Sequence, residues 1–402
     1  MDATRPARNL SVDAERGDMI RVGFGVTALA KAQAGGAHDG ISHYTQELRH
    51  QLNQQPGIRC VPFSFGIAVK DTYCGEPKAD QEPSQTLSRY AKAAAWSVLS
   101  GQDYVGINRV SAKVDLLHAT DHYIPKCHSR PVIASLMDAI PFSHPEWSGG
   151  SFRSIKNAMW LKAISWADKV ITISEYSKDE LSKWANIEPS KIEVIPLGVD
   201  QRWFADVATI ELTRVRQAYQ LPEQFFISVG TLQPRKNIAA TIQAHRELCS
   251  TLRKQYPLVI VGRAGWRCED VLAMIQQDSV AGTVRWLPRV SDQDLLPIVK
   301  LAKGLVFPSL AEGFGLPVLE AFAAQVPVIT SNTTSLPEVA GDAALCVPPK
   351  DVDAIAQSMR RLIDDEALCL RLGARGLERA KAFTWEACAR GTTSMYRKVL
   401  ST

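Results

Sequence analysis

Short runs of apolar and β-branched residues alternate with longer stretches of helical periodicity along almost the whole chain. Strands are predicted at residues 20–26, 58–65, 114–118, 132–136, 169–173 and 191–195, and in a second series at 225–229, 258–261, 284–287, 304–307 and 327–330. Helices are predicted between these strands, for example at residues 42–52, 237–252, 292–301 and 352–363. Because strands separated by helices form βαβ units, this pattern predicts an α/β protein with parallel sheets.

The two series of strands are separated near Pro196, where the first series ends and a polar helical stretch follows. We therefore predict two doubly wound, Rossmann-like domains, at residues 19–200 and 201–382, and a last helix at residues 383–402. Parallel sheets of this kind bind ligands beyond the carboxyl ends of their strands. Loops from the two domains should accordingly face each other across a cleft.

The composition is that of a globular protein of 402 residues, with 46% hydrophobic and 22% charged residues, and this length favours two domains. No apolar run reaches the eighteen or so residues that a membrane-spanning helix needs. Residues 1–18 are polar and lack the apolar core of a signal peptide, so we expect them to be disordered and the protein to be cytoplasmic.

Charge and cysteine content narrow the function further. The formal net charge of +4 is too small to indicate nucleic-acid binding. None of the eight cysteines belongs to a Cys-x-x-Cys pair, so neither a zinc site nor a redox motif is predicted. Asp351 and Asp353 have the spacing of metal ligands, but they begin a predicted helix and are interpreted as an N-cap and a first-turn carboxylate. We expect no metal and no other cofactor.

The most informative segment is Glu312-Gly-Phe-Gly-Leu-Pro-Val-Leu-Glu320, which joins the predicted strand at 304–307 to an apolar helix. Backbone N–H groups at a helix N-terminus attract phosphate, and carboxylates accept hydrogen bonds from sugar hydroxyls. The segment therefore suits a nucleotide sugar. A glycine-rich turn beside a glutamate is also common in doubly wound proteins of other functions, so this segment alone does not decide the ligand.

Three further segments carry a family resemblance: Val194-Ile-Pro-Leu-Gly-Val-Asp200, Val229-Gly-Thr-Leu-Gln-Pro-Arg-Lys-Asn237 and Leu258-Val-Ile-Val-Gly-Arg263. With the Glu-x7-Glu spacing of Glu312 and Glu320, they make the chain resemble the retaining glycosyltransferases of family 4 from about residue 20 to its end. The resemblance implies the GT-B fold, an acceptor-binding first domain and a donor-binding second domain. It also implies that the last helix crosses back to the first domain.

The reaction implied by the resemblance is transfer of a hexose from a nucleotide diphosphate sugar to a hydroxyl group, with retained anomeric configuration. The chain looks nearest to bacterial mannosyl- and rhamnosyltransferases of surface polysaccharide synthesis. This makes GDP-mannose the first candidate donor and a saccharide or lipid-linked saccharide the candidate acceptor. Sugar-nucleotide epimerases and glycan phosphorylases also have the GT-B fold and are the alternative. Incubation with the donor alone would distinguish them from a transferase.

Arg235 and Lys236 follow a predicted strand and open a predicted helix. Cations at this point would stabilise the negative charge that develops on a diphosphate leaving group, Arg by a bidentate contact and Lys as a point charge. The alternative is a solvated start of a helix. Cations oppose the helix dipole there, and this mismatch favours the functional interpretation.

The resemblance assigns roles to the residues of the Glu-x7-Glu segment. Glu320 matches the carboxylate that binds the ribose, and its apolar neighbours make a merely solvated glutamate a poor alternative. Glu312 matches the residue that contacts the donor sugar near the reaction centre. The backbone amides of Phe314, Gly315 and Leu316 are candidates for the diphosphate.

Two other positions are expected at the donor. Gly40 belongs to a Gly-Ile turn before the first helix, where the family approaches the donor phosphates; a plain helix N-terminus is the alternative. Asp39 stands here where a second glycine is usual, and His43 stands where arginine is frequent. The base is expected to be read by backbone groups near Val290.

Two loops of the first domain carry candidate catalytic residues. Related enzymes have a histidine near the donor sugar, and His118 and His122 both fit, with His118 favoured slightly. Asp138 ends the predicted strand at 132–136 and is expected either to activate the acceptor hydroxyl as a base or to cap a loop. Residue 137 is Met where many relatives have His, so the resemblance is weaker at this point.

The stretch at residues 151–166 has apolar residues at helical spacing, with lysines and an arginine between them. Packing against the core with one solvated face is the favoured interpretation. Peripheral contact with a membrane surface, at which a lipid-linked acceptor would be received, is the alternative.

Overall fold

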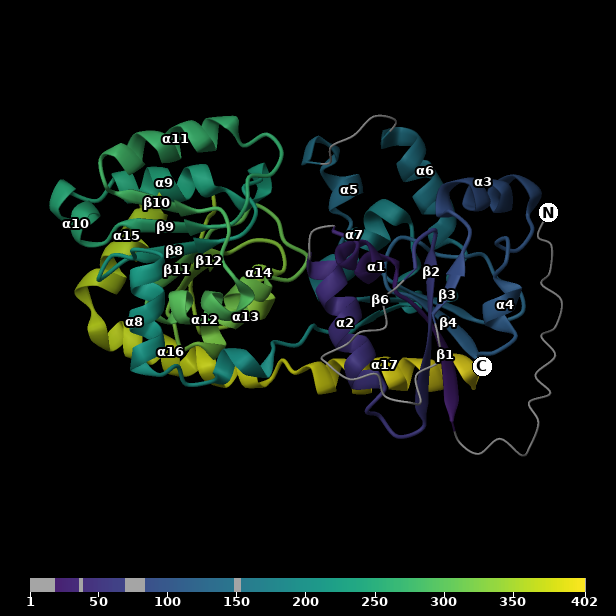
Figure 1. Cartoon of the computed structure of the whole chain (residues 1–402). Helices are drawn as coiled ribbons and strands as arrows, with labels where there is room; N and C mark the ends of the chain where they lie inside the picture. The colour runs from purple at the N-terminus through teal and green to yellow at the C-terminus, as the bar shows by residue number, and fades with distance from the viewer. Residues whose placement is uncertain (1–18, 36–38, 69–83, 148–152, 402) are drawn as a thin grey trace.

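A computed structural model describes residues 19–35, 39–68, 84–147 and 153–401. The expectation of disorder for residues 1–18 lies outside these ranges. The described chain forms two lobes that lie side by side, each built on one parallel sheet (Figure 1). Both sheets are covered by helices, which confirms the predicted GT-B architecture of two Rossmann-like units.

The first sheet has seven strands in the order β3-β2-β1-β4-β5-β6-β7, all paired in parallel. Their bounds are Ile20–Gly25 (β1), Ile58–Phe65 (β2), Gln85–Leu87 (β3), Leu116–Ala119 (β4), Val132–Ser135 (β5), Lys169–Thr172 (β6) and Ile192–Val194 (β7). The order turns back beside β1, and the loops after β1 and β4 therefore leave the sheet at the kind of switch point where ligands bind.

The second sheet has six strands in the order β10-β9-β8-β11-β12-β13, again all parallel. Their bounds are Phe226–Val229 (β8), Leu258–Val261 (β9), Val284–Leu287 (β10), Gly304–Phe307 (β11), Val328–Ser331 (β12) and Leu345–Val347 (β13). Here the order turns back between β8 and β11, so the loops after these two strands share one switch point.

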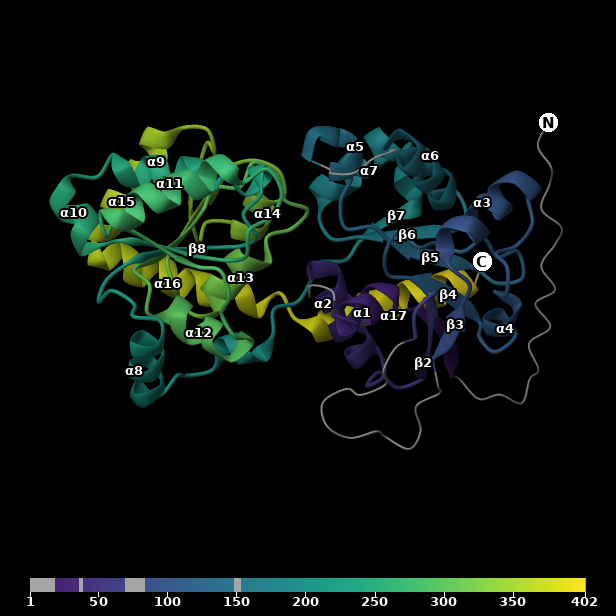
Figure 2. The same cartoon turned by 45° about the horizontal axis from the view of Figure 1, so that its top comes forward.

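The helices of the first lobe are Thr27–Gln33 (α1), Gly40–Leu52 (α2), Tyr90–Ser100 (α3), Asn108–Ser111 (α4), Ile140–Ser143 (α5), Arg153–Ile164 (α6) and Glu175–Ala185 (α7). Those of the second lobe are Thr209–Ala218 (α8), Ile238–Arg246 (α9), Ser250–Gln255 (α10), Glu269–Val280 (α11), Asp292–Lys300 (α12), Leu316–Ala323 (α13), Leu336–Ala340 (α14), Val352–Asp364 (α15) and Glu366–Lys381 (α16). The last helix, Trp385–Leu400 (α17), continues from α16 and lies against the first lobe (Figures 1 and 2).

Successive residues of the central strands point to opposite faces, and both faces are apolar and buried. In β4, Leu116 belongs to the cluster that packs against α2 and α17, whereas Leu117 belongs to the cluster under α3, α6 and α7. Figure 2 shows α17 on one side of this sheet and α6 and α7 on the other. A strand buried on both sides is expected in a doubly wound sheet.

The two lobes are joined by chain segments that cross at Gly198. The Val199 N–H donates to the Phe383 carbonyl at 3.0 Å, and an added Cβ on Gly198 would lie 2.2 Å from the Trp385 nitrogen. From this crossing α17 runs along the first lobe, where Lys398 pairs with Glu193 at 3.0 Å. Glycine is therefore required sterically at the point where the two connections pass.

Two features of the fold differ from the sequence prediction. The edge strands β3 and β13, each of three residues with one buried position, were not predicted. The single helix predicted at 237–252 is in fact two, α9 and α10. It is interrupted where Leu248 is buried, Cys249 is extended, and the Arg360 side chain donates to the Glu247 carbonyl at 2.6 Å. Tertiary contacts here override the helical periodicity.

Candidate active site

A cavity of about 860 Å³ lies between the two lobes. The first lobe contributes the start of α2, with Gly40 and His43, and the second lobe contributes the loop after β8, which ends at Lys236. The start of α13, with Leu316 and Glu320, also lines the cavity. The site thus lies beyond the carboxyl ends of strands of the second sheet, and it brings together residues that are far apart in the sequence.

Three charged side chains form the electrostatic centre of this site. Arg235 Nη1 lies 2.6 Å from one carboxylate oxygen of Glu312, and Lys236 Nζ lies 2.7 Å from the other. The Lys236 and Glu312 side chains are only 12% and 8% exposed, and the ammonium also lies 4.7 Å from the centre of the Phe307 ring. Because two cations face one carboxylate, the site has an excess of one positive charge and is largely shielded from solvent.

The pKa values of these groups follow from burial and from the ion pairs. Burial acts to raise the pKa of Glu312, but Lys236 and Arg235 outweigh it and hold the value at about 2. Burial lowers the pKa of Lys236, and Glu312 opposes this effect. Glu312 is therefore ionised at neutral pH, and the site is prepared for an anion rather than for a proton transfer through this carboxylate.

The turn that carries the cations is built differently from the expectation. Residues Pro234–Lys236 form a short 3-10 helix, η4, and α9 begins only at Ile238. Between them Asn237 has a φ of 56°, and its side-chain amide donates to the Pro308 and Pro349 carbonyls at 2.9 and 2.6 Å. These bonds fix the turn against the loop after β11, which holds the cations beside Glu312.

Glu320 lies deeper along α13, in a second group of charged residues. Burial raises the pKa of Glu320 to about 7, with Asp200 adding to the effect and His43 opposing it. His43 Nε2 lies 3.4 Å from Asp200 Oδ1, which also accepts a hydrogen bond from the Trp385 indole N–H at 2.9 Å. Arg202 pairs with the other Asp200 oxygen at 3.4 Å.

This second group was largely missed in the sequence analysis, which treated His43 only as a departure from the family and gave no role to Asp200 or Arg202. Burial lowers the pKa of His43, but Asp200, Glu47 and Glu320 outweigh it, so the value is raised. The sequence did contain a signal for Asp200. This residue ends the segment between the two domains and must therefore lie near the cleft.

The loop from Glu312 to α13 places its three candidate amides in different surroundings. Leu316 lines the cavity, whereas Phe314 is buried, packs against Phe383 with ring centres 5.8 Å apart, and does not line it. Gly315 caps α13 with a φ of 124°, a conformation that favours glycine. The Phe314 carbonyl accepts a hydrogen bond from the Ser335 hydroxyl at 2.8 Å, which fixes the loop.

The same loop is held to the first lobe at Gly313. Its carbonyl accepts hydrogen bonds from the Ser174 and Ser177 hydroxyls at 2.8 and 3.1 Å, both at the start of α7. An added Cβ on Gly313 would lie 2.8 Å from the Met137 carbonyl oxygen and 3.1 Å from the Asp138 Cβ. The Glu312 loop and the loop after β5 are therefore in direct contact across the lobe boundary.

Asp138 has features of both predicted roles, a loop cap and a base for the acceptor hydroxyl. One of its oxygens accepts a hydrogen bond from the Ile140 N–H at 3.0 Å, as a loop cap would. Its side chain also lines a second cavity, of about 540 Å³, in the first lobe. Burial raises the pKa of Asp138, Arg235 opposes this, and Glu312 adds to it, so the carboxyl group is electrostatically coupled to the centre of the cleft.

His118 does not lie in the cleft. It is fully buried, with Nδ1 2.7 Å from the Tyr396 hydroxyl of α17 and Nε2 2.8 Å from the Ser135 hydroxyl. Burial lowers its pKa to about 3, so the ring is neutral. It lines neither of these two cavities, and the slight preference for His118 over His122 as the donor-facing histidine is corrected. His122 is exposed and lines the cavity of the first lobe, 4.1 Å from the Tyr123 ring centre.

Gly40 and Val290 are the remaining residues that were expected at the donor, and only Gly40 lines the cavity. Gly40 lines the cavity, and an added Cβ there would meet no atom within 4 Å. Asp39 caps α2 by accepting a hydrogen bond from the Ser42 N–H at 2.9 Å. Val290 is half-buried against the core and does not line the cavity, whereas Asp292, two residues on, does.

Neither a metal site nor a membrane-spanning helix is present within the described residues. The ranges that the structure describes contain no group of three His, Cys, Asp or Glu side chains that could hold a metal ion. Asp351 caps α15 by accepting from the Ala354 N–H at 2.9 Å, as predicted. None of the described helices has the length and apolar character needed to cross a membrane. In α6, Ala163 and Ile164 are buried, whereas Ile155 is 58% exposed.

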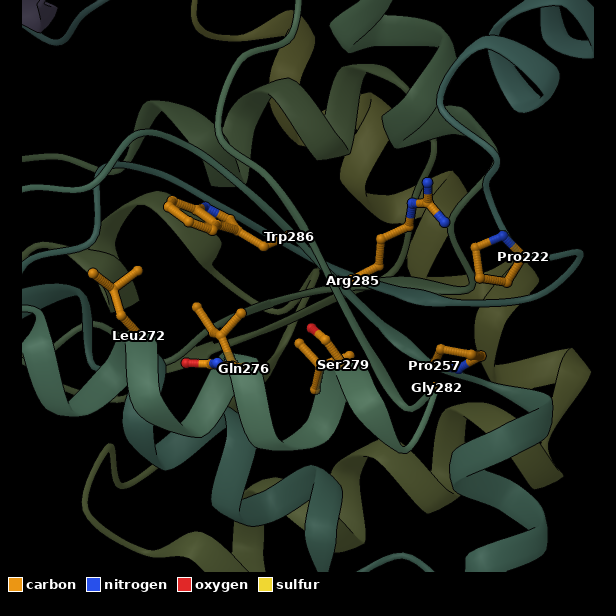
Figure 3. A pocket seen from close by; sticks show the side chains of 10 residues that line it. Pro222, Pro257, Leu272, Gln276, Ser279, Gly282, Arg285 and Trp286 are labelled. Carbon is orange, nitrogen blue, oxygen red and sulfur yellow. The ribbon is translucent and has the colours of Figure 1, made fainter.

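Another cavity, of about 670 Å³, lies on the second lobe between α11 and the sheet (Figure 3). It is lined by Pro257 and Gly282, which precede β9 and β10, and by Trp286. It therefore lies near the amino ends of these strands, at the edge of the sheet opposite to the usual ligand loops. Among the described residues that line it, Arg285 is the only charged one, and no carboxylate accompanies it.

Comparison with known proteins agrees with this geometry. Residues 210–379 match the family model of glycosyl transferases group 1, and residues 39–203 match that of glycosyltransferase family 4. The O-antigen chain mannosyltransferase B of Escherichia coli is 32% identical over 309 residues, which cover 77% of this chain and 78% of that relative.

Solved structures share the fold at lower identity. Sucrose-phosphate synthase from Thermosynechococcus elongatus has a TM-score of 0.71 at 20% identity, covering 95% of this chain and 99% of that one. Anabaena HepE, in complex with UDP and glucose, has a TM-score of 0.71 at 15% identity, covering 94% and 100%. The chain therefore belongs to the family 4 glycosyltransferases of the GT-B fold, and it is a glycosyltransferase.

Proposed function

We propose that the protein transfers a hexose, with mannose from GDP-mannose as the first candidate, to a hydroxyl group of a saccharide or lipid-linked saccharide, with retained anomeric configuration. The observation that carries this proposal is the partly buried cluster of Arg235, Lys236 and Glu312 beside a cavity lined by both lobes. An excess of positive charge at a strand-to-helix turn suits a diphosphate, and the adjoining carboxylate suits sugar hydroxyls.

The cations would act mainly on the leaving group. As the bond to the anomeric carbon breaks, negative charge grows on the diphosphate, and Arg235 and Lys236 are fixed in position to stabilise it. Preorganisation matters here, because the η4 turn is already held by the Asn237 amide and the cations need little rearrangement. On donor binding the diphosphate would share with Glu312 the two cations that now face this carboxylate alone.

Glu312 would bind the donor sugar and support charge at the anomeric carbon. Its low pKa keeps it ionised, and its pairing with two cations makes it a weak nucleophile. This favours a reaction on one face of the sugar, in which the departing phosphate assists deprotonation of the acceptor. Asp138 is the second candidate base, since its carboxyl group borders the cavity of the first lobe.

Glu320 would accept hydrogen bonds from the ribose hydroxyls, since it lines the same cavity as Lys236, from helix α13. His43 and Asp200 would then lie beside the nucleoside. These two residues come from α2 and from the connection between the lobes, so a bound nucleotide would touch both lobes at once.

The choice of mannose rests on the relatives. The Escherichia coli relative that matches over 77% of this chain is named as a mannosyltransferase of the O-antigen chain. A thermal-shift screen of GDP-, UDP-, ADP- and dTDP-sugars tests the donor, because a ligand that binds the native state alone raises the melting temperature. We expect GDP-mannose to give the largest shift, and a larger shift with another nucleotide would contradict this choice.

Incubation with the selected donor then tests the reaction. We expect a glycosidic product only when a mannose-terminated saccharide is added, with the α configuration of the donor retained in the proton NMR spectrum of the product. A changed sugar nucleotide in the absence of acceptor would contradict transfer and would indicate epimerisation.

A further inference from the structure

The start of α7 in the first lobe is capped by a carboxylate of the second lobe. The two carboxylate oxygens of Glu338 accept hydrogen bonds from the Glu175 N–H at 2.9 Å and from the Tyr176 N–H at 2.7 Å. Glu338 belongs to α14, which both views of the molecule place on the side of the second lobe that faces the first (Figures 1 and 2). A side chain of one lobe thus binds the backbone of the other at two points.

Helix α7 does not depend on this contact for its own N-cap. The Ser174 hydroxyl accepts a hydrogen bond from the Ser177 N–H at 3.0 Å, as an N-cap does. The N–H groups of Glu175 and Tyr176 have no acceptor within the helix, and Glu338 accepts from both. Because this contact is exposed, water would satisfy the same N–H groups if the lobes separated. The contact can therefore form and break without unfolding either lobe.

The chemistry of the contact favours a carboxylate. Both hydrogen bonds are charge-assisted, and the start of a helix carries a partial positive charge. At an exposed position such a contact is of modest strength, and added salt weakens it. Modest strength suits a reversible association between the two lobes.

The segment around α14 also fixes the Glu312 loop. The hydroxyl of Ser335, which precedes α14, donates to the Glu312 and Phe314 carbonyls at 2.8 Å each. At the other end of α14, Arg379 of α16 donates to the Val339 carbonyl at 3.1 Å. Helix α14 is therefore held firmly within the second lobe, and the Glu312 loop is held to it.

Helix α7 contacts the same loop directly. The Gly313 carbonyl accepts the hydrogen bonds from the Ser174 and Ser177 hydroxyls, and both serines are buried. The start of α7 thus touches the second lobe at Gly313 and at Glu338, two parts of one connected unit. A shift of α7 against α14 would move the groups of the first lobe relative to Glu312.

We propose that Glu338 is a positioning residue for the transfer reaction, which holds the Glu312 loop at a fixed place relative to the first lobe by binding the start of α7. The proposal rests on the proposed transferase function. Glu338 lines neither the cleft cavity nor the cavity of the first lobe, so it acts through the lobes that it joins.

The contact should affect turnover more than nucleotide binding. Small displacements of reacting groups lower a rate steeply, and the first lobe would carry the acceptor. Arg235 and Lys236, which would bind the diphosphate, both belong to the second lobe and would keep their places if the lobes moved apart.

The test compares Glu338→Ala and Glu338→Gln with the wild type in the full chain. The control is Glu378→Ala, which removes a glutamate of α16 that pairs with Lys381 of the same helix at 2.6 Å. Steady-state kinetics use GDP-mannose and a mannose-terminated saccharide, and calorimetry measures GDP affinity. Hydrogen exchange followed by mass spectrometry reports on residues 174–177 and 312–316.

We expect Glu338→Ala to lower kcat about tenfold and Glu338→Gln, which keeps one acceptor oxygen, to lower it less. GDP affinity should stay within about threefold of the wild type in both, which also shows that they fold. Exchange should become faster both at the start of α7 and in the Glu312 loop. The Glu378→Ala control should match the wild type in every measurement.

A wild-type kcat in Glu338→Ala would overturn the assignment. Unchanged exchange in the Glu312 loop would also overturn it, because Glu338 would then be at most a local cap of α7. Absence of both GDP binding and mannose transfer in the wild type would instead contradict the proposed function.

Discussion

Glu312 holds the two cations of the cleft in place, with Arg235 at 2.6 Å and Lys236 at 2.7 Å. Because the three groups are largely dry, their interactions are stronger than those of a surface ion pair. Lys236 is the less exposed of the two cations, 12% against 25% for Arg235, and its ammonium group also lies 4.7 Å from the centre of the Phe307 ring.

Lys236→Ala should lower kcat more than about tenfold, equivalent to about 1.4 kcal/mol of transition-state stabilisation. The reason is the loss of a charge that stabilises the leaving diphosphate. Lys303→Ala is a matched control, because Lys303 is 11% exposed in the same lobe and pairs with Glu366 at 2.6 Å away from the cavity. Steady-state kinetics with near wild-type kcat for Lys236→Ala would refute the role.

Donor affinity should depend on pH through Glu320, whose pKa is raised to about 7. Ribose hydroxyls donate best to the ionised carboxylate, so GDP-mannose affinity should be constant above pH 7 and fall by up to about tenfold per pH unit below it. Calorimetric titration between pH 5.5 and 8.5 measures this slope.

Glu320→Gln should remove most of that slope, because the amide has no proton to gain. His43, whose pKa is also raised, faces the same carboxylate together with Asp200 and Arg202. His43→Gln separates its contribution from that of Glu320. A wild-type affinity that does not change between pH 8 and pH 6 would contradict the ribose contact.

At the level of elements, the connection at Gly198 is the most constrained part of the fold. An added Cβ would lie 2.2 Å from the Trp385 nitrogen and 2.6 Å from the Thr384 carbonyl carbon. Gly198→Ala should therefore force the two connections apart and lower the free energy of unfolding by about 2 kcal/mol or more. Denaturant unfolding measures this change.

Gly40→Ala is the comparison for that experiment, since no atom lies within 4 Å of an added Cβ at this helix start. It should leave the unfolding free energy within about 0.5 kcal/mol of wild type. Its methyl group would project into the cleft cavity, so GDP-mannose affinity should fall instead. Equal stability of the Gly198→Ala variant and the wild type would show that the connections can separate freely.

Most elements could be predicted from the sequence because central strands of a doubly wound sheet are continuous apolar runs; the predicted strand at 58–65 coincides with β2. His118 shows why side-chain directions were harder. Alternate residues of a strand face opposite ways, and His118 shares a face with Leu116 rather than pointing into the cleft. Its partner Tyr396 lies 278 residues away on α17, a contact that no local pattern contains.

At the scale of the whole molecule, we propose that charged side chains, and not a bound metal ion, stabilise the leaving group in the cleft. We expect activity to be unchanged after treatment with EDTA, because Arg235 and Lys236 supply the positive charge that a metal would otherwise provide. The measurement is the initial transfer rate with and without the chelator. Activity that is abolished by EDTA and restored by magnesium would contradict this view.

The family resemblance pointed to the cleft motifs because glycines, cations and carboxylates recur there at fixed spacing. The structure places Gly40, Arg235, Lys236 and Glu320 in the wall of the cleft cavity, with Glu312 paired to the two cations. The His43–Asp200 pair and the cavity of the first lobe could not be predicted, because each is assembled from segments of ordinary composition that meet only in the folded chain.

The central claim is that the diphosphate of an activated sugar binds at the η4 turn between the lobes. A crystal structure of the protein soaked with GDP tests it most directly. We predict phosphate oxygens within about 4 Å of both Arg235 and Lys236, with the ribose hydroxyls at Glu320. Density for GDP in the groove beside Trp286 (Figure 3), or anywhere else away from this turn, would contradict the account.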